Sequence, residues 1–205
     1  TLDGGLGNDS LFGGTPSDIL SYTTSIGAIT INLVTNRASG AAGVDSLSGF
    51  EYVISGAGAD SLLGDASANT LLGGDGADTL DGGLGNDSLV GGGDSDFVSY
   101  AAAAGAVTIN LASNRATGAA GDDSIAGIQH AMSGGGADSL LGDASNNLLA
   151  GNGGTDTLDG GLGADTLDGG AGHDLVMGGD GNDMLIGGDG NDTLLGQAGD
   201  ANISG

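Results

Sequence analysis

A nine-residue repeat dominates the sequence and limits the folds that are open to it. Fifteen copies of the pattern GGxGxDxLx lie within the blocks 1–21, 55–99 and 133–205. The eighth position is aliphatic in every copy, the sixth is Asp in twelve, and the first, second and fourth are mostly Gly. A short fixed period of this kind predicts a repeat architecture in which each unit stacks on its neighbours.

Each part of the nonapeptide favours a different local structure. The first six residues are rich in Gly and Asp, which disfavours a helix by about 1 kcal/mol per Gly and favours a turn with positive φ. The last three residues alternate around one aliphatic side chain, as in a very short strand with one inward-facing residue. Two nonapeptides therefore make one coil. Stacked coils pair their strands in parallel, about 4.8 Å apart, around a thin ladder of eighth-position side chains.

Stacking also brings the sixth-position carboxylates together. The turns of repeats n and n+2 lie on the same edge, so their Asp side chains come within several Å of one another. At an effective dielectric constant of about 20, two such charges repel by roughly 3 kcal/mol, and a long row of them needs a counter-ion. Carboxylates and the carbonyls of Gly-rich turns are oxygen ligands, and calcium accepts six to eight of them in irregular geometry.

The candidate calcium ligands share the sixth position of the repeat. Pairs in which one member is Asn69 or Asn147 lose a charge and are expected to bind more weakly. Ala201 predicts an incomplete site in the last repeat. Pro16, in the second repeat, predicts incomplete sites at Asp9 and Asp18. The twelve candidates are Asp9, Asp18, Asp60, Asp78, Asp87, Asp96, Asp138, Asp156, Asp165, Asp174, Asp183 and Asp192.

The pattern GGxGxDxLx resembles the RTX, or hemolysin-type, calcium-binding repeat. The resemblance extends over about 135 of the 205 residues as complete nonapeptides. It implies a right-handed parallel β-roll or β-helix solenoid with Ca²⁺ ions between successive turns. It also implies export by type I secretion, as part of a larger secreted bacterial protein. The sequence opens in the middle of a repeat, which agrees with that expectation.

A second, longer period is superimposed on the first. The segment 4–81 matches the segment 82–159, and each copy contains a stretch that does not follow the nonapeptide pattern. These interruptions are 22–54 and 100–132, and their alternating apolar residues predict strands with one buried face. Asn36 and Asn114 indicate turns.

The interruptions leave the phase of the flanking repeats unchanged. We interpret each as one or two wider coils of a single continuous solenoid over 1–205. The alternative is a loop or hairpin on the side of the roll. The wider core would be filled in part by Phe50, Val53, Ile128 and Met132.

Composition excludes several functional classes. With two basic residues, 27 acidic residues and a net charge of -25, the chain has no basic face for nucleic acid. It has no Cys for disulfides or thiolate sites, and its apolar runs are too short to span a membrane. His130 and His173 have no apparent catalytic or zinc-binding partners in the sequence. We therefore expect a chain that is not an enzyme.

The leading hypothesis is a calcium-binding module that folds on binding several Ca²⁺ ions outside the cell. The resemblance implies a secreted or cell-surface location, and the type I secretion machinery as a partner. The open ends of a solenoid would also allow self-association. The alternatives are the repeat region of an adhesin or surface-layer protein, and an accessory module of a secreted protease, lipase or alginate epimerase whose active site lies outside this chain.

Overall fold

A computed structural model describes residues 1–14 and 17–205. Pro16, which predicted an incomplete site, lies outside the described residues. Every regular element in the described part of the chain is a β-strand. No helix there is long and apolar enough to cross a membrane. The chain divides into two compact units.

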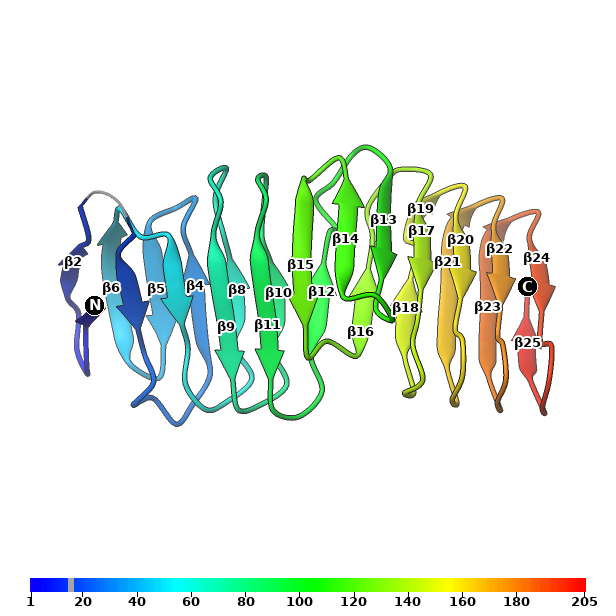
Figure 1. The fold of residues 1–205 in the computed structure, drawn as a ribbon, viewed down its shortest axis with the longest axis horizontal. Helices are drawn as coiled ribbons and strands as arrows, with labels where there is room; N and C mark the ends of the chain where they lie inside the picture. The colour runs from blue at the N-terminus through cyan, green and yellow to red at the C-terminus, as the bar shows by residue number, and fades with distance from the viewer. Residues whose placement is uncertain (15–16) are drawn as a thin grey trace. The chain divides into compact units, whose positions relative to one another are not determined.

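Unit 1 comprises Thr1–Val98 and Gly121–Ile128. Its strands form two sheets, in the orders β1-β3-β7-β9-β11-β15 and β2-β6-β5-β4-β8-β10-β12. Successive nonapeptides contribute strands to the two sheets in turn, so each coil places one strand in each sheet (Figure 1). The strands are β1 (Leu2–Asp3), β2 (Ser10–Phe12), β3 (Ile19–Ser21), β4 (Ile29–Asn32), β5 (Arg37–Gly40), β6 (Gly43–Ser48), β7 (Tyr52–Ile54), β8 (Ser61–Leu63), β9 (Thr70–Gly74), β10 (Thr79–Asp81), β11 (Ser88–Gly92), β12 (Phe97–Ser99) and β15 (Asp122–Ala126).

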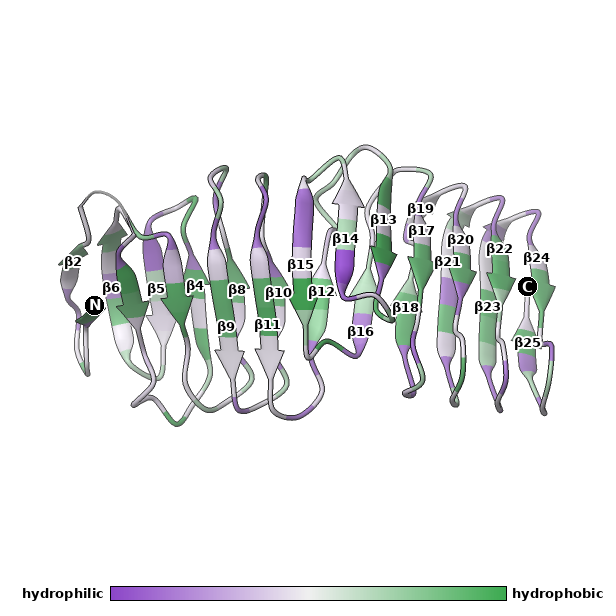
Figure 2. Cartoon of the chain, viewed as in Figure 1, coloured by the Kyte–Doolittle hydropathy of each residue, from purple (hydrophilic) through white to green (hydrophobic). Residues whose placement is uncertain are grey.

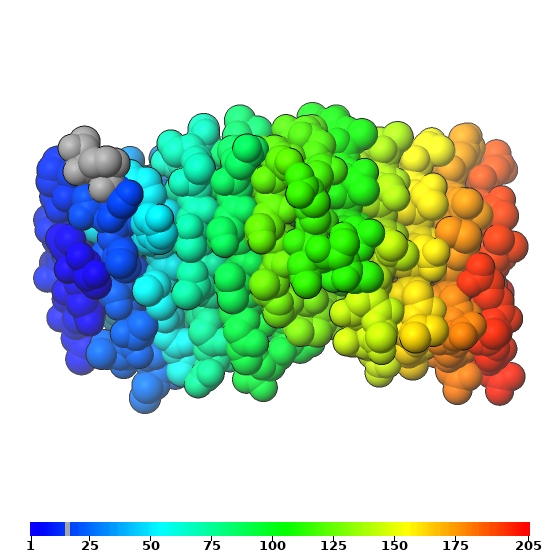
Figure 3. Space-filling view, in the orientation of Figure 1, coloured from blue at the N-terminus to red at the C-terminus, as the bar shows by residue number. Residues whose placement is uncertain are grey.

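Unit 2 comprises Ser99–Ala120 and Gln129–Gly205. Its sheets have the orders β14-β13-β17-β20-β22-β24 and β16-β18-β21-β23-β25, with β19 also paired to β21. Within the unit, the coils form successive bands of surface in chain order (Figure 3). The strands are β13 (Val107–Asn110), β14 (Arg115–Gly118), β16 (His130–Met132), β17 (Ser139–Leu141), β18 (Leu148–Ala150), β19 (Gly153–Gly154), β20 (Thr157–Asp159), β21 (Thr166–Gly172), β22 (Leu175–Met177), β23 (Met184–Gly190), β24 (Thr193–Leu195) and β25 (Asn202–Ser204).

The register follows the nonapeptide. Strands of repeats n and n+2 pair in parallel, so that Leu62 lies opposite Leu80 and Leu71 opposite Leu89. The two members of each pair are separated by two nonapeptides, which together make one coil. The predicted all-β architecture with parallel sheets is therefore confirmed. The single continuous solenoid over 1–205 stays a prediction.

The eighth-position side chains form the core. Twelve of the fifteen are at most 1% exposed, and hydrophobic residues concentrate on the strands while many turns are hydrophilic (Figure 2). Each such buried aliphatic side chain contributes about 1.5–3 kcal/mol relative to exposure. Leu11 and Leu194 are half-buried, and Ile203 is 50% exposed, because they belong to the outermost strands of their sheets.

The interruptions do not form the expected wider coils. In unit 1, β4 pairs antiparallel with β5, and β5 pairs antiparallel with β6. The outer strands of this meander pair in parallel with nonapeptide strands, β6 with β2 and β4 with β8. The interruption is thus built into the sheet rather than placed on its side. Its connections are only a few residues long, which suits antiparallel neighbours but not a crossover to the other sheet.

The same local folding recurs in unit 2, where β13 pairs antiparallel with β14. Asn36 and Asn114 adopt φ of 56° and 57°, which confirms the predicted turns. Three of the four residues proposed for the wider core, Phe50, Val53 and Ile128, are buried. Met132 is only half-buried, so that expectation was wrong.

The error at Met132 follows from the alternation of side chains along a strand. In β16 the middle residue, Ala131, is fully buried and lies opposite the eighth-position Leu149. Met132 follows Ala131 directly, so its side chain points to the other face of the sheet.

Candidate calcium sites

The interruptions contain two further repeats that the sequence analysis missed. Residues 40–48 read GAAGVDSLS and residues 118–126 read GAAGDDSIA. Both segments keep the residues that define the repeat, with Gly at the first and fourth positions, Asp at the sixth and an aliphatic residue at the eighth. In the structure Ser46 and Leu47 lie opposite Ser10 and Leu11 of the first repeat. Asp45 and Asp123 are both 2% exposed, like the other sixth-position Asp residues.

A recurring hydrogen bond fixes the sixth-position carboxylates inside the stack. The backbone N–H of Asp60 donates to Oδ1 of Asp78, 2.8 Å away, and the N–H of Asp78 donates to Oδ1 of Asp96 at 2.9 Å. The same bond recurs within unit 2, from Asp138 to Asp156 and from Asp156 to Asp174, both at 2.8 Å. These bonds show that repeats n and n+2 bring their carboxylates together on one edge, as the sequence predicts.

In eight of the predicted ligands, the second carboxylate oxygen is left without a protein partner. A buried carboxylate oxygen that makes no hydrogen bond destabilises the folded state, because it has lost its water and gained no partner. A cation could satisfy a row of such oxygens. The Oδ2 atoms concerned are buried and accept no hydrogen bond in Asp9, Asp78, Asp87, Asp138, Asp156, Asp165, Asp174 and Asp183.

The first-position glycines keep space open beside these Oδ2 atoms. A Cβ at Gly73 would lie 2.2 Å from Oδ2 of Asp78 and 2.6 Å from the carbonyl oxygen of Gly91. At Gly160 it would lie 2.4 Å from Oδ2 of Asp165 and 2.5 Å from the Gly178 carbonyl oxygen. Carboxylate and carbonyl oxygens therefore converge where only Gly fits.

This donor set fits calcium. No group of three or more His, Cys, Asp or Glu side chains suited to a metal occurs among the described residues. The ligands available at each gap are instead one or two carboxylates together with backbone carbonyls, which are the hard oxygen donors that Ca²⁺ prefers. When bound, the ion supplies positive charge between facing Asp side chains.

Within each unit, these backbone-to-carboxylate hydrogen bonds link the sixth-position residues into two rows, one on each edge. In unit 1, the Asn69 N–H donates to Asp87 and the Asp87 N–H to Asp123. In unit 2, one row is Asp138, Asp156, Asp174 and Asp192, and the other is Asn147, Asp165 and Asp183.

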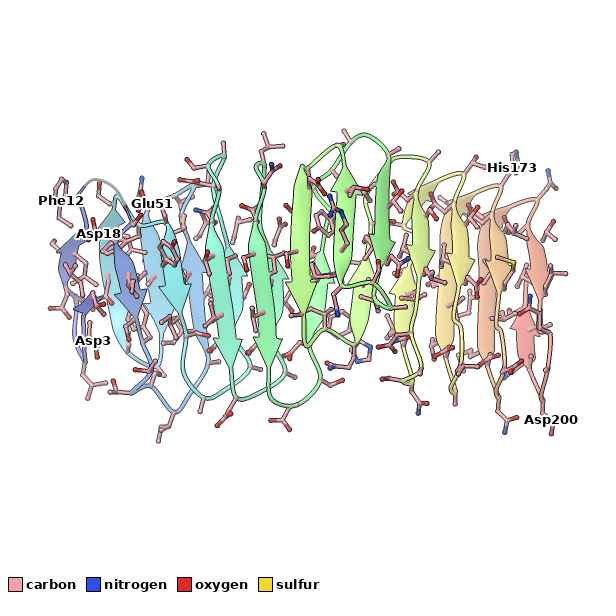
Figure 4. All side chains as sticks on the ribbon, viewed as in Figure 1. Asp3, Phe12, Asp18, Glu51, His173 and Asp200 are labelled. Carbon is pink, nitrogen blue, oxygen red and sulfur yellow. The ribbon has the colours of Figure 1, made fainter. Side chains whose placement is uncertain are left out.

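Asp18 and Asp183 face residues other than Asp in the next coil. Next to Asp18 lies Glu51, whose Oε2 accepts the N–H of Ser17 and of Asp18 at 3.0 and 3.1 Å (Figure 4). The position that follows Asp183 in the next coil is Ala201, because β23 pairs with β25. These arrangements give a physical basis for incomplete sites at both positions.

Asn147 fills its gap with its own amide. Its Nδ2 donates to the Gln129 carbonyl at 2.7 Å and to Oδ1 of Asp143 at 3.3 Å. An amide hydrogen therefore already lies against oxygens that a cation could use. The weaker binding expected of the Asn147/Asp165 pair stays a prediction, now with this physical reason.

The fifth position, which looked variable in sequence, also links the coils. Oδ1 of Asn146 accepts the N–H of Ala164 at 2.8 Å, and Oδ1 of Asn182 accepts that of Asp200 at 3.1 Å. His173 does the same, because its Nδ1 accepts the N–H of Asn191 at 2.9 Å. Its role in the fold is to hold neighbouring turns together.

Burial raises the pKa of four sixth-position carboxyls to about 6. Desolvation is the main cause. A backbone N–H bond to each carboxylate lowers the pKa in part, and neighbouring carboxylates raise it further. The four are Asp78, Asp87, Asp156 and Asp165. Without a cation, the charged form of these side chains is therefore disfavoured in the folded state.

These raised pKa values predict how the metal-free protein responds to pH. A carboxyl with a pKa near 3.9 unfolded and about 6 folded stabilises the fold below about pH 4, and this contribution is lost as pH rises through 6. In chelator, we expect the far-UV β signal and the urea midpoint to be higher at pH 4.5 than at pH 7. A metal-free stability that rises across this interval would contradict the assignment.

Asp174 and Asp168 provide a matched test of the ligand rows. Asp174 accepts the Asp156 N–H and has a buried free Oδ2, whereas Asp168 is a half-buried ninth-position residue in β21. We expect Asp174→Ala to shift calcium-driven folding to about tenfold higher calcium and Asp168→Ala to shift it less than twofold. Asp174→Asn retains an oxygen that can accept the Asp156 N–H but removes the negative charge. It therefore separates the effect of the hydrogen bond from the effect of the charge. Equal shifts for the two Ala variants in a calcium titration would refute the phase of the repeat.

Comparison with known proteins agrees with this geometry. The family model for the RTX calcium-binding nonapeptide repeat, which spans four copies, matches most of the chain. One match begins at Asp45, within a repeat that the sequence analysis did not identify. The search of curated proteins finds no match. The matched segments are 1–21, 45–80, 54–89, 63–98, 132–167 and 168–203. The chain therefore belongs to the RTX calcium-binding repeat family, as a β-roll whose nonapeptides bind Ca²⁺.

Proposed function

We propose that this chain is a structural module of a larger secreted protein, and that it folds when it meets calcium outside the cell. The observation that supports this most directly is the set of buried Oδ2 atoms without partners in both units. The metal ligands we assign are the twelve sixth-position Asp residues predicted from sequence. Asp18 and Asp183, which face Glu51 and Ala201, are expected to complete their sites less fully than Asp78 and Asp156, which face Asp. The RTX repeat is a structural repeat, and the role proposed for this chain is not catalytic.

Two features make the metal-free coil unstable. The rows of carboxylates repel, and the nonapeptide core is one aliphatic residue wide on each side. Ordering Gly-rich turns also costs more backbone entropy than ordering other residues. Because an ion that binds only the folded chain stabilises it by mass action, calcium binding and folding are coupled.

The calcium gradient across the cell boundary then sets where folding occurs. Extracellular modules commonly bind calcium with dissociation constants of about 10⁻⁴–10⁻³ M, far above cytosolic levels. The chain would stay extended during export by the type I machinery that its family implies, and would fold after release. The proposed location is the extracellular medium or the cell surface.

The test is to count bound ions. Native mass spectrometry and equilibrium dialysis at pH 7 are expected to show several Ca²⁺ ions per chain, bound in step with the gain of β structure. Magnesium is the control, because it requires a stricter octahedral shell and releases its waters reluctantly. A chain that binds no calcium, or binds magnesium equally well, would refute the proposal.

One observation favours an adhesin or surface-layer protein as the parent molecule over a small secreted enzyme. The duplication of 4–81 as 82–159 repeats nonapeptides and interruption together, as in a long repetitive stalk. Sedimentation with calcium and with chelator distinguishes a monomeric spacer, whose mass stays that of one chain, from a module that self-associates through its ends.

A further inference from the structure

The interruption 22–54 of unit 1 is packed differently from the nonapeptides that follow it. It contains nine buried apolar side chains, whereas the longer nonapeptide segment 55–98 contains five. Buried apolar side chains are therefore denser along the interruption, and hydrophobic burial requires no ion. The nine are Tyr22, Ile29, Ile31, Leu33, Ala38, Ala42, Leu47, Phe50 and Val53.

The buried carboxylate of this segment is satisfied by the protein itself. Oδ1 of Asp45 accepts the N–H of Asp9 at 2.9 Å, and Oδ2 accepts the hydroxyl of Tyr22 at 2.5 Å. Tyr22 is 1% exposed and Asp45 2% exposed. At Asp78, Asp87, Asp138 and Asp156 in the nonapeptide rows, the corresponding Oδ2 atom has no hydrogen-bond donor. A phenol hydroxyl therefore occupies the place where those coils present an oxygen without a donor.

Other protein groups close the coils on either side. Oε2 of Glu51 accepts two backbone N–H groups, from Ser17 and Asp18. The buried hydroxyl of Ser55 donates to the carbonyl of Gly73 in the next coil. Carboxylate and carbonyl oxygens that could face a cation elsewhere here accept hydrogen bonds from side chains and backbone.

We propose that the segment 22–54 closes without calcium and serves as the folding nucleus of unit 1, from which calcium-dependent coils extend through β8 to β12. The contrast rests on the proposed function, in which calcium closes the nonapeptide coils. The duplication repeats these two residue types at Tyr100 and Asp123, each of which is buried.

Hydrogen exchange of the whole chain, read by mass spectrometry at pH 7 in chelator and in calcium, tests this proposal. We expect amides of β4 to β7 to be protected in both conditions and amides of β8 to β12 only in calcium. If both regions are unprotected in chelator and protected in calcium, the nucleus is refuted while the proposed function stands. If both are fully protected in chelator, calcium-dependent folding itself is refuted.

Tyr22→Phe isolates the hydroxyl, because the ring still fills the core while Oδ2 of Asp45 loses its donor. We expect about a tenfold loss of protection for β4 to β7 in chelator, as for a hydrogen bond to a buried charge. Tyr52→Phe is the matched control, since Tyr52 is 39% exposed and lies in the same segment. Unchanged protection in Tyr22→Phe, or an equal loss in Tyr52→Phe, would refute the role of Tyr22.

Discussion

Chelation of calcium at pH 7 is expected to remove most of the far-UV β signal of this chain, and readdition of calcium is expected to restore it. The physical reason lies in the rows of sixth-position Asp residues. Neighbouring carboxylates in these rows are joined through one backbone N–H, for example from Asp156 to Asp174, and their Oδ2 atoms have no partner. At an effective dielectric constant of about 20, each close pair costs roughly 3 kcal/mol, so several pairs exceed the roughly 5–15 kcal/mol that stabilises a typical domain.

Circular dichroism during a calcium titration measures this effect, with magnesium at the same concentrations as the control. The transition is expected to be steep, because one coil supports the next and several ions bind together. A residual β signal in chelator would correspond to the interruptions. A β signal that is already complete in chelator would refute the mechanism.

Gly160→Ala is expected to cost about 3 kcal/mol of unfolding free energy in saturating calcium, an unusually large effect for a single added methyl group. The new Cβ would lie 2.4 Å from Oδ2 of Asp165 and 2.5 Å from the carbonyl oxygen of Gly178. The carbonyl belongs to the backbone, and the Asp165 carboxylate is held by the Asn147 N–H on Oδ1, so relieving the clash would shift the turn or break that bond. Because the same atoms are candidate calcium ligands, the calcium midpoint for folding should also rise.

Gly135→Ala is the matched control for this substitution. Gly135 lies in the same unit, and a Cβ there would meet no atom within 4 Å. Neither Gly160 nor Gly135 has a positive φ, so backbone strain does not distinguish them. Urea unfolding in calcium should show a change within about 0.5 kcal/mol for Gly135→Ala. Similar losses in the two variants would show that the first-position Gly is not needed for contact with the carboxylate.

Much of the candidate site could be predicted from the sequence because the nonapeptide encodes it locally. The pairing of repeats n and n+2 follows from the length of one coil, and the hydrogen bonds from Asp60 to Asp78 and from Asp138 to Asp156 have that spacing. The repeats at Asp45 and Asp123 were also readable in principle. They were missed because Ala stands at their second position and the surrounding sequence lacks the nonapeptide phase.

By itself, the sequence determined the short strands, the aliphatic ladder and the rows of Asp, because each depends on residues within one or two repeats. Only the tertiary structure decided that β5 runs antiparallel, and that Tyr22 and Glu51 satisfy polar groups in distant parts of the chain, at Asp45 and Asp18 respectively. The alternation of apolar residues is the same in parallel and antiparallel strands, and a tyrosine gives no local signal of the carboxylate it will meet. Those choices are made when distant segments pack together and buried oxygens require donors.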